Sequence, residues 1–278
     1  MKLKDSLRNL VPDRVVEAKR SATRRLQRWR DLRDPRIQRN ATLCNQHAGR
    51  RAFVLGNGPS LKDRNLENLA DEITICCNAF WKHDIVEVWQ PTYYALADPV
   101  FFDRSSESES FLDELASFCP SSRLIAPLEK ADNLRRKGLE ERFAPIYFVS
   151  TPELGKGGVD LTEEIVRVQN VVQLSLCTAI HLGCDPIYLL GVDHDWIKDW
   201  LEEDAYSHFY DGETIEDHRA TNRKNELSKK SFLEVIDPLY KMFRSYEVIE
   251  REAREREIRI FNATEGSLLD IFDFSTIQ

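Results

Sequence analysis

Polar residues that can bind a nucleotide follow short apolar runs at five places in the chain. These residues are Asn57, Asn78, Asp98, the pair Asp193 and His194, and the pair Asn262 and Thr264. Asn side chains hydrogen-bond a base or sugar in either direction, and Asp carboxylates hold ribose hydroxyls or a divalent ion such as Mg²⁺. Strand carboxyl ends share one edge of an open parallel sheet, where ligands bind in a crevice. We therefore expect these residues to converge on one site, although each alone could be an ordinary turn residue.

The first of these places is a glycine-rich turn. Gly56, Asn57, Gly58, Pro59 and Ser60 follow the apolar run Ala52–Leu55. We expect a strand, a tight turn and a helix that Ser60 caps, with the polar segment 62–70 behind it. Glycines and a helix N-terminus together would form an anion site, and the alternative is a plain strand–helix turn. The turn is neither a Walker motif nor a dinucleotide fingerprint, because no GK[ST] follows and the third glycine is missing.

A long polar and aromatic segment, residues 198–225, contains the sequence Tyr206-Ser-His208-Phe-Tyr210. A loop of this length is often a lid or an acceptor-binding segment. His208 could serve as a general base, since imidazole titrates near neutral pH, and the hydroxyls of Tyr206 and Tyr210 could bind a phosphate. The alternative is that these aromatic side chains only hold the loop in place.

The elements that must position these residues alternate between strand and helix. Strands are expected at 52–55, 72–76, 93–97, 123–126, 145–149, 186–190 and 258–261, and helices at 105–118, 171–182 and 226–257. This alternation predicts an α/β, Rossmann-like fold with a mostly parallel sheet and helices on both faces. We expect a nucleotide-binding domain at 49–278, with a lid at about 195–226, preceded by a helical arm at 1–48.

The arm is basic, whereas the rest of the chain is acidic. Residues 1–51 contain 15 Lys and Arg against 5 Asp and Glu, and the remainder contains 24 against 42. Apolar residues recur at helical spacing in residues 1–40, with arginines between them. The pattern fits a helix on an anionic membrane surface, a helix that packs on the body or on a second subunit, or a solvated charged helix. Nucleic acid is not expected as a partner of an acidic body.

The composition sets further limits. No run of eighteen apolar residues is present, and the N-terminus lacks the apolar region of a secretory signal, so we expect a cytoplasmic protein. The six cysteines, at 44, 76, 77, 119, 177 and 184, form no C-x-x-C pair and lie mostly in apolar runs. We interpret them as reduced core thiols, neither a disulfide framework nor a zinc site.

Several motifs, taken in order, resemble one superfamily. They are GNGPSL after a strand, a strand that ends at Asn78, A-D-P-x-F-F at 97–102, AIHLGCDPIYLLGVDH at 179–194, S-H-F-Y at 207–210, and I-x-I-F-N-A-T-x-G at 258–266. The superfamily contains bacterial lipooligosaccharide sialyltransferases, motility-associated flagellin glycosyltransferases and archaeal 6-hydroxymethyl-dihydropterin pyrophosphokinases. The resemblance covers residues 51–272 and leaves out the basic arm.

The resemblance implies a Rossmann-like domain with a lid, in which the glycine turn and Asn57 and Asn78 hold a CMP-sugar. It also implies that a lid histidine acts as base, lid tyrosines hold the leaving phosphate, and no metal is required. His208 matches a Ser-His-aromatic pattern of the lid, whereas the sialyltransferase base lies slightly further along, where this chain has Asp211 and Gly212. Asp98 stands where the sialyltransferases have asparagine. The pyrophosphokinases use ATP and a metal, which Asp98 and Asp193 would suit.

We therefore interpret the chain as a cytoplasmic, sialyltransferase-like glycosyltransferase of surface-glycan (lipopolysaccharide-type) assembly. It would move an acidic sugar from a nucleotide-linked donor to a glycan or lipid-linked acceptor by direct displacement, with the arm on the inner membrane or in self-association. Two alternatives stay open: a Mg²⁺-dependent pyrophosphokinase of the pterin type, and a non-catalytic scaffold of the same fold.

Overall fold

The chain forms one eight-stranded, all-parallel sheet with the order β5-β4-β3-β2-β1-β6-β7-β8. The computed structural model describes residues 13–62, 64–103, 105–143, 145–151, 157–195 and 230–277, and for residues 13–20 and 24 only the backbone. The strands are β1 (Ala52–Leu55), β2 (Ile73–Cys77), β3 (Tyr93–Ala95), β4 (Arg123–Pro127), β5 (Ile146–Val149), β6 (Ile187–Leu190), β7 (Ile260–Asn262) and β8 (Asp273–Phe274).

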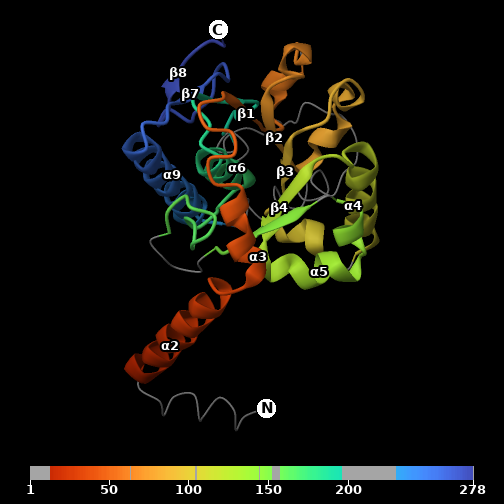
Figure 1. Ribbon diagram of the computed structural model, residues 1–278. Coiled ribbons are helices and arrows are strands. Elements are labelled where there is room, and N and C mark those ends of the chain that lie inside the picture. Colours follow the sequence, from red (N-terminus) through yellow and green to blue (C-terminus); the bar gives the residue numbers. More distant parts are fainter. Residues whose placement is uncertain are drawn as a thin grey trace.

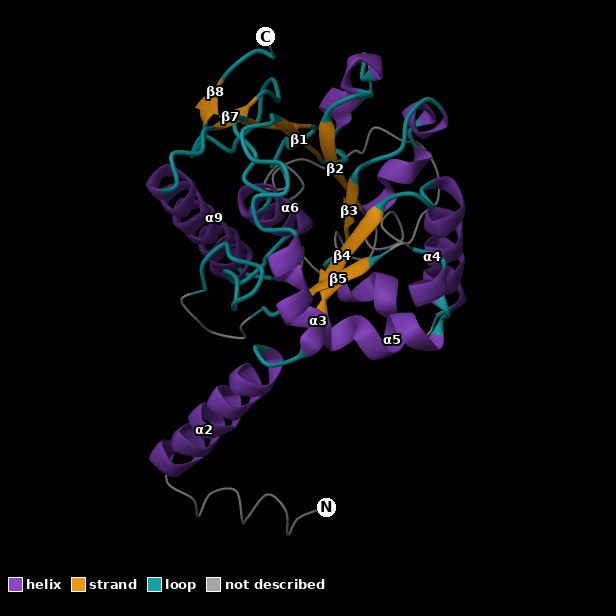
Figure 2. Cartoon of the chain, viewed as in Figure 1, coloured by secondary structure: helices purple, strands orange, loops and turns teal. Residues whose placement is uncertain are grey.

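Helices cover both faces of this sheet (Figures 1 and 2). The helices are α2 (Asp13–Asp31), α3 (Pro35–Gln38), α4 (Ser106–Phe118), α5 (Ala131–Arg136), α6 (Val171–His181) and α9 (Phe232–Glu255). Figure 1 shows α6 and α9 on one face and α4 and α5 on the other. None of the described helices is long and apolar enough to cross a membrane.

The central strands are apolar throughout because both of their faces are buried. In β1, Phe53 and Leu55 point into the core beneath α4 and α5, whereas Ala52 and Val54 point into the core beneath α6 and α9. All four side chains are fully buried. A strand that is buried on both sides needs an unbroken apolar run, which is what the sequence shows.

The arm joins the body at the β5 edge of the sheet. Helix α2 extends away from the body, and α3 contacts β5 (Figure 1). Asn40, which is fully buried, donates hydrogen bonds from Nδ2 to the carbonyls of Phe148 and Leu161, both at 2.7 Å. Ile37 and Leu43 are also fully buried. The segment that connects α2 to the sheet is therefore part of the packed fold.

The predicted fold class is confirmed, and each of the seven predicted strands, and each of the helices predicted at 105–118, 171–182 and 226–257, has a counterpart. One strand was not predicted. Strand β8 has only two residues and has no apolar pattern to reveal it. The expected lid at about 195–226 lies, beyond Asp195, outside the described residues.

The helix expected after the glycine turn is absent, and this prediction was wrong. Residues Pro59–Leu61 form a single 3₁₀ turn that begins after Gly58, and Ser60 does not cap it. A second short turn, Glu67–Leu69, follows, and the Asn65 side chain accepts from the Glu67 N–H at 2.8 Å. The buried leucines of this segment, Leu61 and Leu66, are five residues apart, so one helix could not place both on the same face.

Candidate functional site

At the carboxyl edge of the sheet, the turns that follow β1 and β6 lie side by side. Strand β1 pairs with β2 on one side and with β6 on the other, so the strand order reverses here. In open α/β sheets, ligands bind outside the carboxyl ends of the strands at such a switch point. The two turns are Gly56–Ser60, after β1, and Gly191–His194, after β6.

These two turns pack against each other too closely for any residue but glycine. The Gly56 N–H donates to the Leu190 carbonyl at 2.8 Å, and the Gly58 N–H donates to the Gly191 carbonyl at 2.9 Å. A Cβ atom on Gly56 would lie 2.3 Å from the Gly191 oxygen. Gly191 itself has a φ of +65°. The two glycine amides therefore hold the β1 turn to the β6 turn and are not free to cradle a phosphate.

Asp193 stands at the centre of this contact. Its Oδ2 accepts a hydrogen bond from Ser60 Oγ at 2.9 Å and lies 1.6 Å from where a Cβ atom of Gly58 would be. Burial raises the pKa of the Asp193 carboxyl, the hydrogen bond from Ser60 partly opposes this, and the charge of Asp195 adds to the rise. The acidic group is thus held between the two turns in an environment that favours its protonated form more than water does.

Two amide side chains lie at the ends of the neighbouring strands β1 and β2. Asn57 is buried, and its Nδ2 donates to the Cys77 carbonyl at 3.2 Å. Asn78 has a φ of +49°, and its backbone carbonyl accepts from the Tyr94 hydroxyl at 2.6 Å. The Asn78 Oδ1 is buried and has no hydrogen-bond partner among the described residues. A buried acceptor of this kind is completed by a ligand donor or by water.

Asn262 and Thr264 use their polar atoms inside the protein. The Asn262 Nδ2 donates to Ser267 Oγ at 3.0 Å and to the Leu269 carbonyl at 2.9 Å, and its Oδ1 accepts from the Thr264 N–H. The Thr264 Oγ1 accepts from the Val192 N–H at 3.1 Å. These two residues therefore brace the turn after β6 from the side of β7.

His194 faces the helices rather than the glycine turn. Its ring is buried against α9, with Nε2 2.8 Å from the Tyr246 hydroxyl, which in turn donates to Asn170 Oδ1 at 3.0 Å. Burial lowers the pKa of His194 to about 3, so the ring is neutral at physiological pH. The sequence pattern gave no sign of Asn170 and Tyr246, because Asn170 is an ordinary N-cap residue of α6 and Tyr246 lies among ordinary helical residues of α9.

Asp98 forms the start of the short turn Pro99–Phe102, where its Oδ1 accepts from the Val100 N–H at 3.0 Å. The described residues contain no group of three or more His, Cys, Asp or Glu side chains placed to hold a metal ion. Mg²⁺ at Asp98 and Asp193 remains a prediction from the sequence. The expected catalytic residues Tyr206, His208 and Tyr210 lie outside the described residues, in the segment that begins two residues after His194.

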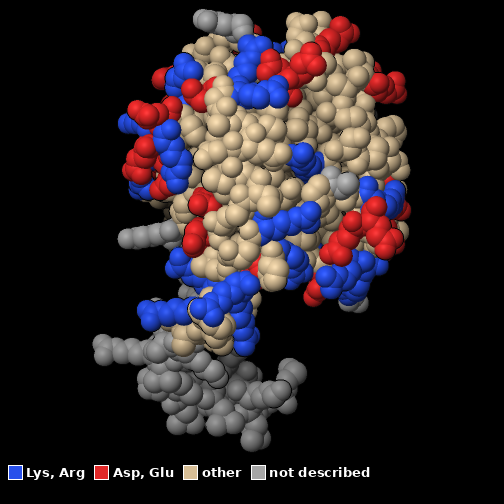
Figure 3. Space-filling view, in the orientation of Figure 1, with Lys and Arg blue, Asp and Glu red and all other residues tan. Residues whose placement is uncertain are grey.

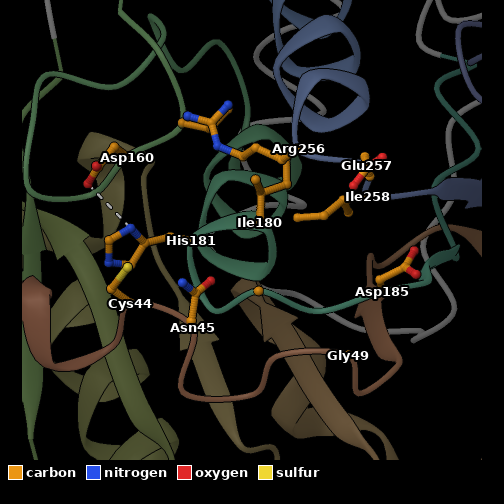
Figure 4. Close-up of a pocket in the computed structure, with 12 residues that line it drawn as sticks. Cys44, Asn45, Gly49, Asp160, Ile180, His181, Asp185, Arg256, Glu257 and Ile258 are labelled. Atoms are coloured by element: carbon orange, nitrogen blue, oxygen red, sulfur yellow. Dashed lines mark ion pairs between the residues drawn. The ribbon is translucent and has the colours of Figure 1, made fainter.

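A hollow of about 400 Å³ lies at the opposite edge of the sheet (Figure 4). Its walls come from segments that precede β1, β6 and β7, and they include Cys44, Asp160, His181, Asp185 and Arg256. The His181 Nδ1 lies 3.3 Å from Asp160 Oδ1, and its Nε2 lies 2.9 Å from the carbonyl oxygen of Asn40. This histidine therefore anchors the base of the arm.

Comparisons with known proteins give limited similarity. No family model and no curated protein matches the sequence. The structure is similar to that of the sialyltransferase CstII from Campylobacter jejuni in complex with the substrate analogue CMP-3FNeuAc. That likeness has a TM-score of 0.43 at 16% identity and covers 81% of this chain and 85% of that one. An α-2,3-sialyltransferase from the same organism, in apo form, gives a TM-score of 0.42 at 15% identity, over 82% of this chain and 80% of that one.

Proposed function

We propose that this protein is a transferase that takes a sugar from a nucleotide-linked donor bound at the carboxyl ends of β1, β2 and β6. The observation that carries this proposal is the buried Asn78 Oδ1, which has no partner among the described residues and lies beside the switch point. An amino group of a base or a sugar hydroxyl would complete it. The ordered motifs that resemble the sialyltransferases favour a CMP-linked acidic sugar as the donor.

The reaction we propose is a direct displacement at the anomeric carbon. The acceptor oxygen forms a bond to that carbon while the bond from the carbon to the phosphate oxygen breaks and the nucleotide leaves. His208 would take the proton of the acceptor hydroxyl. The amides of Gly56 and Gly58 already donate to β6, and no helix follows them. We therefore assign the stabilisation of the departing phosphate to the hydroxyls of Tyr206 and Tyr210.

The acceptor we propose is a surface glycan or its lipid-linked precursor. A lipid-linked acceptor requires the enzyme to work at a membrane surface.

Nucleotide binding by the full chain tests the proposal. Calorimetry with CMP and a CMP-sugar should show binding, and Asn78→Gly should weaken it by about tenfold, the value of one hydrogen bond. Glycine tolerates the positive φ of this position, so the backbone is preserved. Asn45→Gly is the matched control, because Asn45 also has a positive φ (54°) but borders the hollow at the opposite edge. It should bind nucleotide like the unchanged protein.

The outcomes separate the alternatives. The proposal would be refuted if CMP, CMP-sugars and ATP all left the melting temperature unchanged. The assigned site would be refuted if Asn78→Gly and Asn45→Gly bound nucleotide with equal affinity. Release of AMP from ATP only when Mg²⁺ is present would favour the pyrophosphokinase. A biological role that survives both His208→Ala and Asp98→Ala would favour the scaffold.

A further inference from the structure

Helix α2 presents an apolar stripe that the body does not cover. Its 19 residues span about 28 Å and lead away from the sheet (Figure 1). Ala22, Leu26 and Trp29 are spaced four and three residues apart and so share one side of the helix. Leu26 is 49% exposed and Trp29 is 52% exposed. Large apolar side chains in a row at a helix surface indicate contact with something beyond the chain.

Arginines without a carboxylate partner flank this stripe. Arg25, Arg30 and Arg33 form no ion pair with any described side chain, and the Arg33 guanidinium lies 4.2 Å from the centre of the Trp29 ring. Exposed arginines of the body are bound differently: Arg142 pairs with Asp113, Arg244 with Glu247, and Arg254 with Glu250. Figure 3 shows the blue Lys and Arg surface gathered where α2 meets the body.

Away from the stripe, one side chain of α2 contacts the body. Arg28 pairs with Glu164 at 3.4 Å, which ties the helix to the segment before α6. Asp31 accepts from Gln27 Nε2 at 2.7 Å. Among the described side chains, the apolar residues of α2 therefore lie on one side with exposed arginines beside them, whereas Arg28, on the other side, is bound to the body.

We propose that the stripe and its arginines, the surface made by Ala22, Arg25, Leu26, Trp29 and Arg30 of α2 and by Arg33 just after it, dock onto an anionic lipid membrane. An interfacial helix buries Trp and Leu at the acyl boundary while cations on either flank contact anionic headgroups. The free arginines complement that surface in charge. A protein partner would have to bury about 800 Å² on each side, more than this narrow stripe supplies. The body, with its acidic excess, is repelled by the same surface, so only the arm faces it.

Co-sedimentation of the full chain with lipid vesicles tests this proposal. The protein should bind vesicles of equal parts phosphatidylcholine and phosphatidylglycerol and should not bind phosphatidylcholine alone. The triple variant Arg25→Gln, Arg30→Gln, Arg33→Gln should weaken binding by at least about 30-fold, as expected for three cations near an anionic surface. The matched control is Arg142→Gln, Arg244→Gln, Arg254→Gln, which removes the same charge from the body and should bind almost unchanged.

The apolar part is tested by Leu26→Ser with Trp29→Ser, which should also weaken binding, without changing the net charge. The tryptophan emission of the unchanged protein should shift to the blue with anionic vesicles, and Trp29→Phe should remove that shift. Equal weakening by the arm and body triple variants would overturn the proposal, as would no binding of the unchanged protein. Dimerisation that depends on Leu26 and Trp29 and persists with no vesicle binding would overturn it in favour of a second copy of the chain.

Discussion

Acid should destabilise this protein through one buried ring, that of His194. The imidazole is enclosed by α6 and α9, with the Tyr246 hydroxyl and Asn170 beside it, and its pKa is about 3 against an ordinary value of 6.5. Between pH 6.5 and 3, the ring therefore binds a proton in the unfolded chain but stays neutral in the folded state. Stability should be unaffected above pH 6.5, and should fall as the pH drops from there toward 3.

The size of this effect follows from the two pKa values. Each unit of difference corresponds to about 1.4 kcal/mol, so full acidification should cost about 5 kcal/mol of the free energy of unfolding. Over the experimentally convenient interval from pH 7 to pH 5, the loss should be about 2 kcal/mol. That is a large share of the roughly 5–15 kcal/mol by which a domain is stable.

Urea denaturation at a series of pH values measures this loss of unfolding free energy. His194→Asn should remove the steep loss of stability below pH 6.5, because Asn cannot titrate, and it tolerates the φ of +56° at this position. His83→Asn is the control: the ring is only half-buried, and Asn can replace it as the cap of the turn at Asp84–Glu87. This control should change the pH dependence less. The reasoning would be refuted if the unfolding free energy of His194→Asn depended on pH as steeply as that of the unchanged protein, or if NMR showed His194 titrating near pH 6.5.

Two further substitutions test the turn contact and the arm anchor. Gly58→Ala should cost about 1–3 kcal/mol of unfolding free energy and reduce nucleotide affinity, because its Cβ would collide with Asp193. In the control Gly158→Ala, the nearest neighbour of the new Cβ would be at 3.5 Å, so the unfolding free energy should change by less than about 0.5 kcal/mol. Equal costs for the two variants would contradict the contact. Asn40→Ala should cost about 2–3 kcal/mol, since it leaves the carbonyls of Phe148 and another buried residue without their donor. Limited proteolysis should then cut the variant near α3 first, and an unchanged digestion pattern would argue against the anchor.

The sheet could be predicted from the sequence because its signal is local and repeated. Ala52–Leu55 and Ile187–Leu190 are unbroken apolar runs, each ended by glycine or polar residues, and buried parallel strands require that pattern. Strand β8 left no such signal, since its two residues are exposed and pair only along one edge of β7.

The site was harder to predict because its contacts join distant segments. Ser60 looked like a helix cap, but its hydroxyl donates to Asp193, 133 positions away. The glycines looked like a phosphate cradle, yet the close approach of the β6 turn needs them for packing. His194 stands next to Asp193 in the sequence and points to the other side, against Tyr246. Position along the chain indicated which turns meet, but it could not indicate which atoms face each other.

The short join between α2 and the sheet has a geometric consequence. Only residues 32–34 separate α2 from α3, and their backbone N–H groups donate to Arg28, Arg30 and Asp31. A helix that lies flat in a lipid surface would thus set the tilt of the whole sheet above it. The distance from the membrane to the turns after β1 and β6 would be fixed. The arm would therefore favour acceptors whose reactive hydroxyl stands at that distance from the lipid.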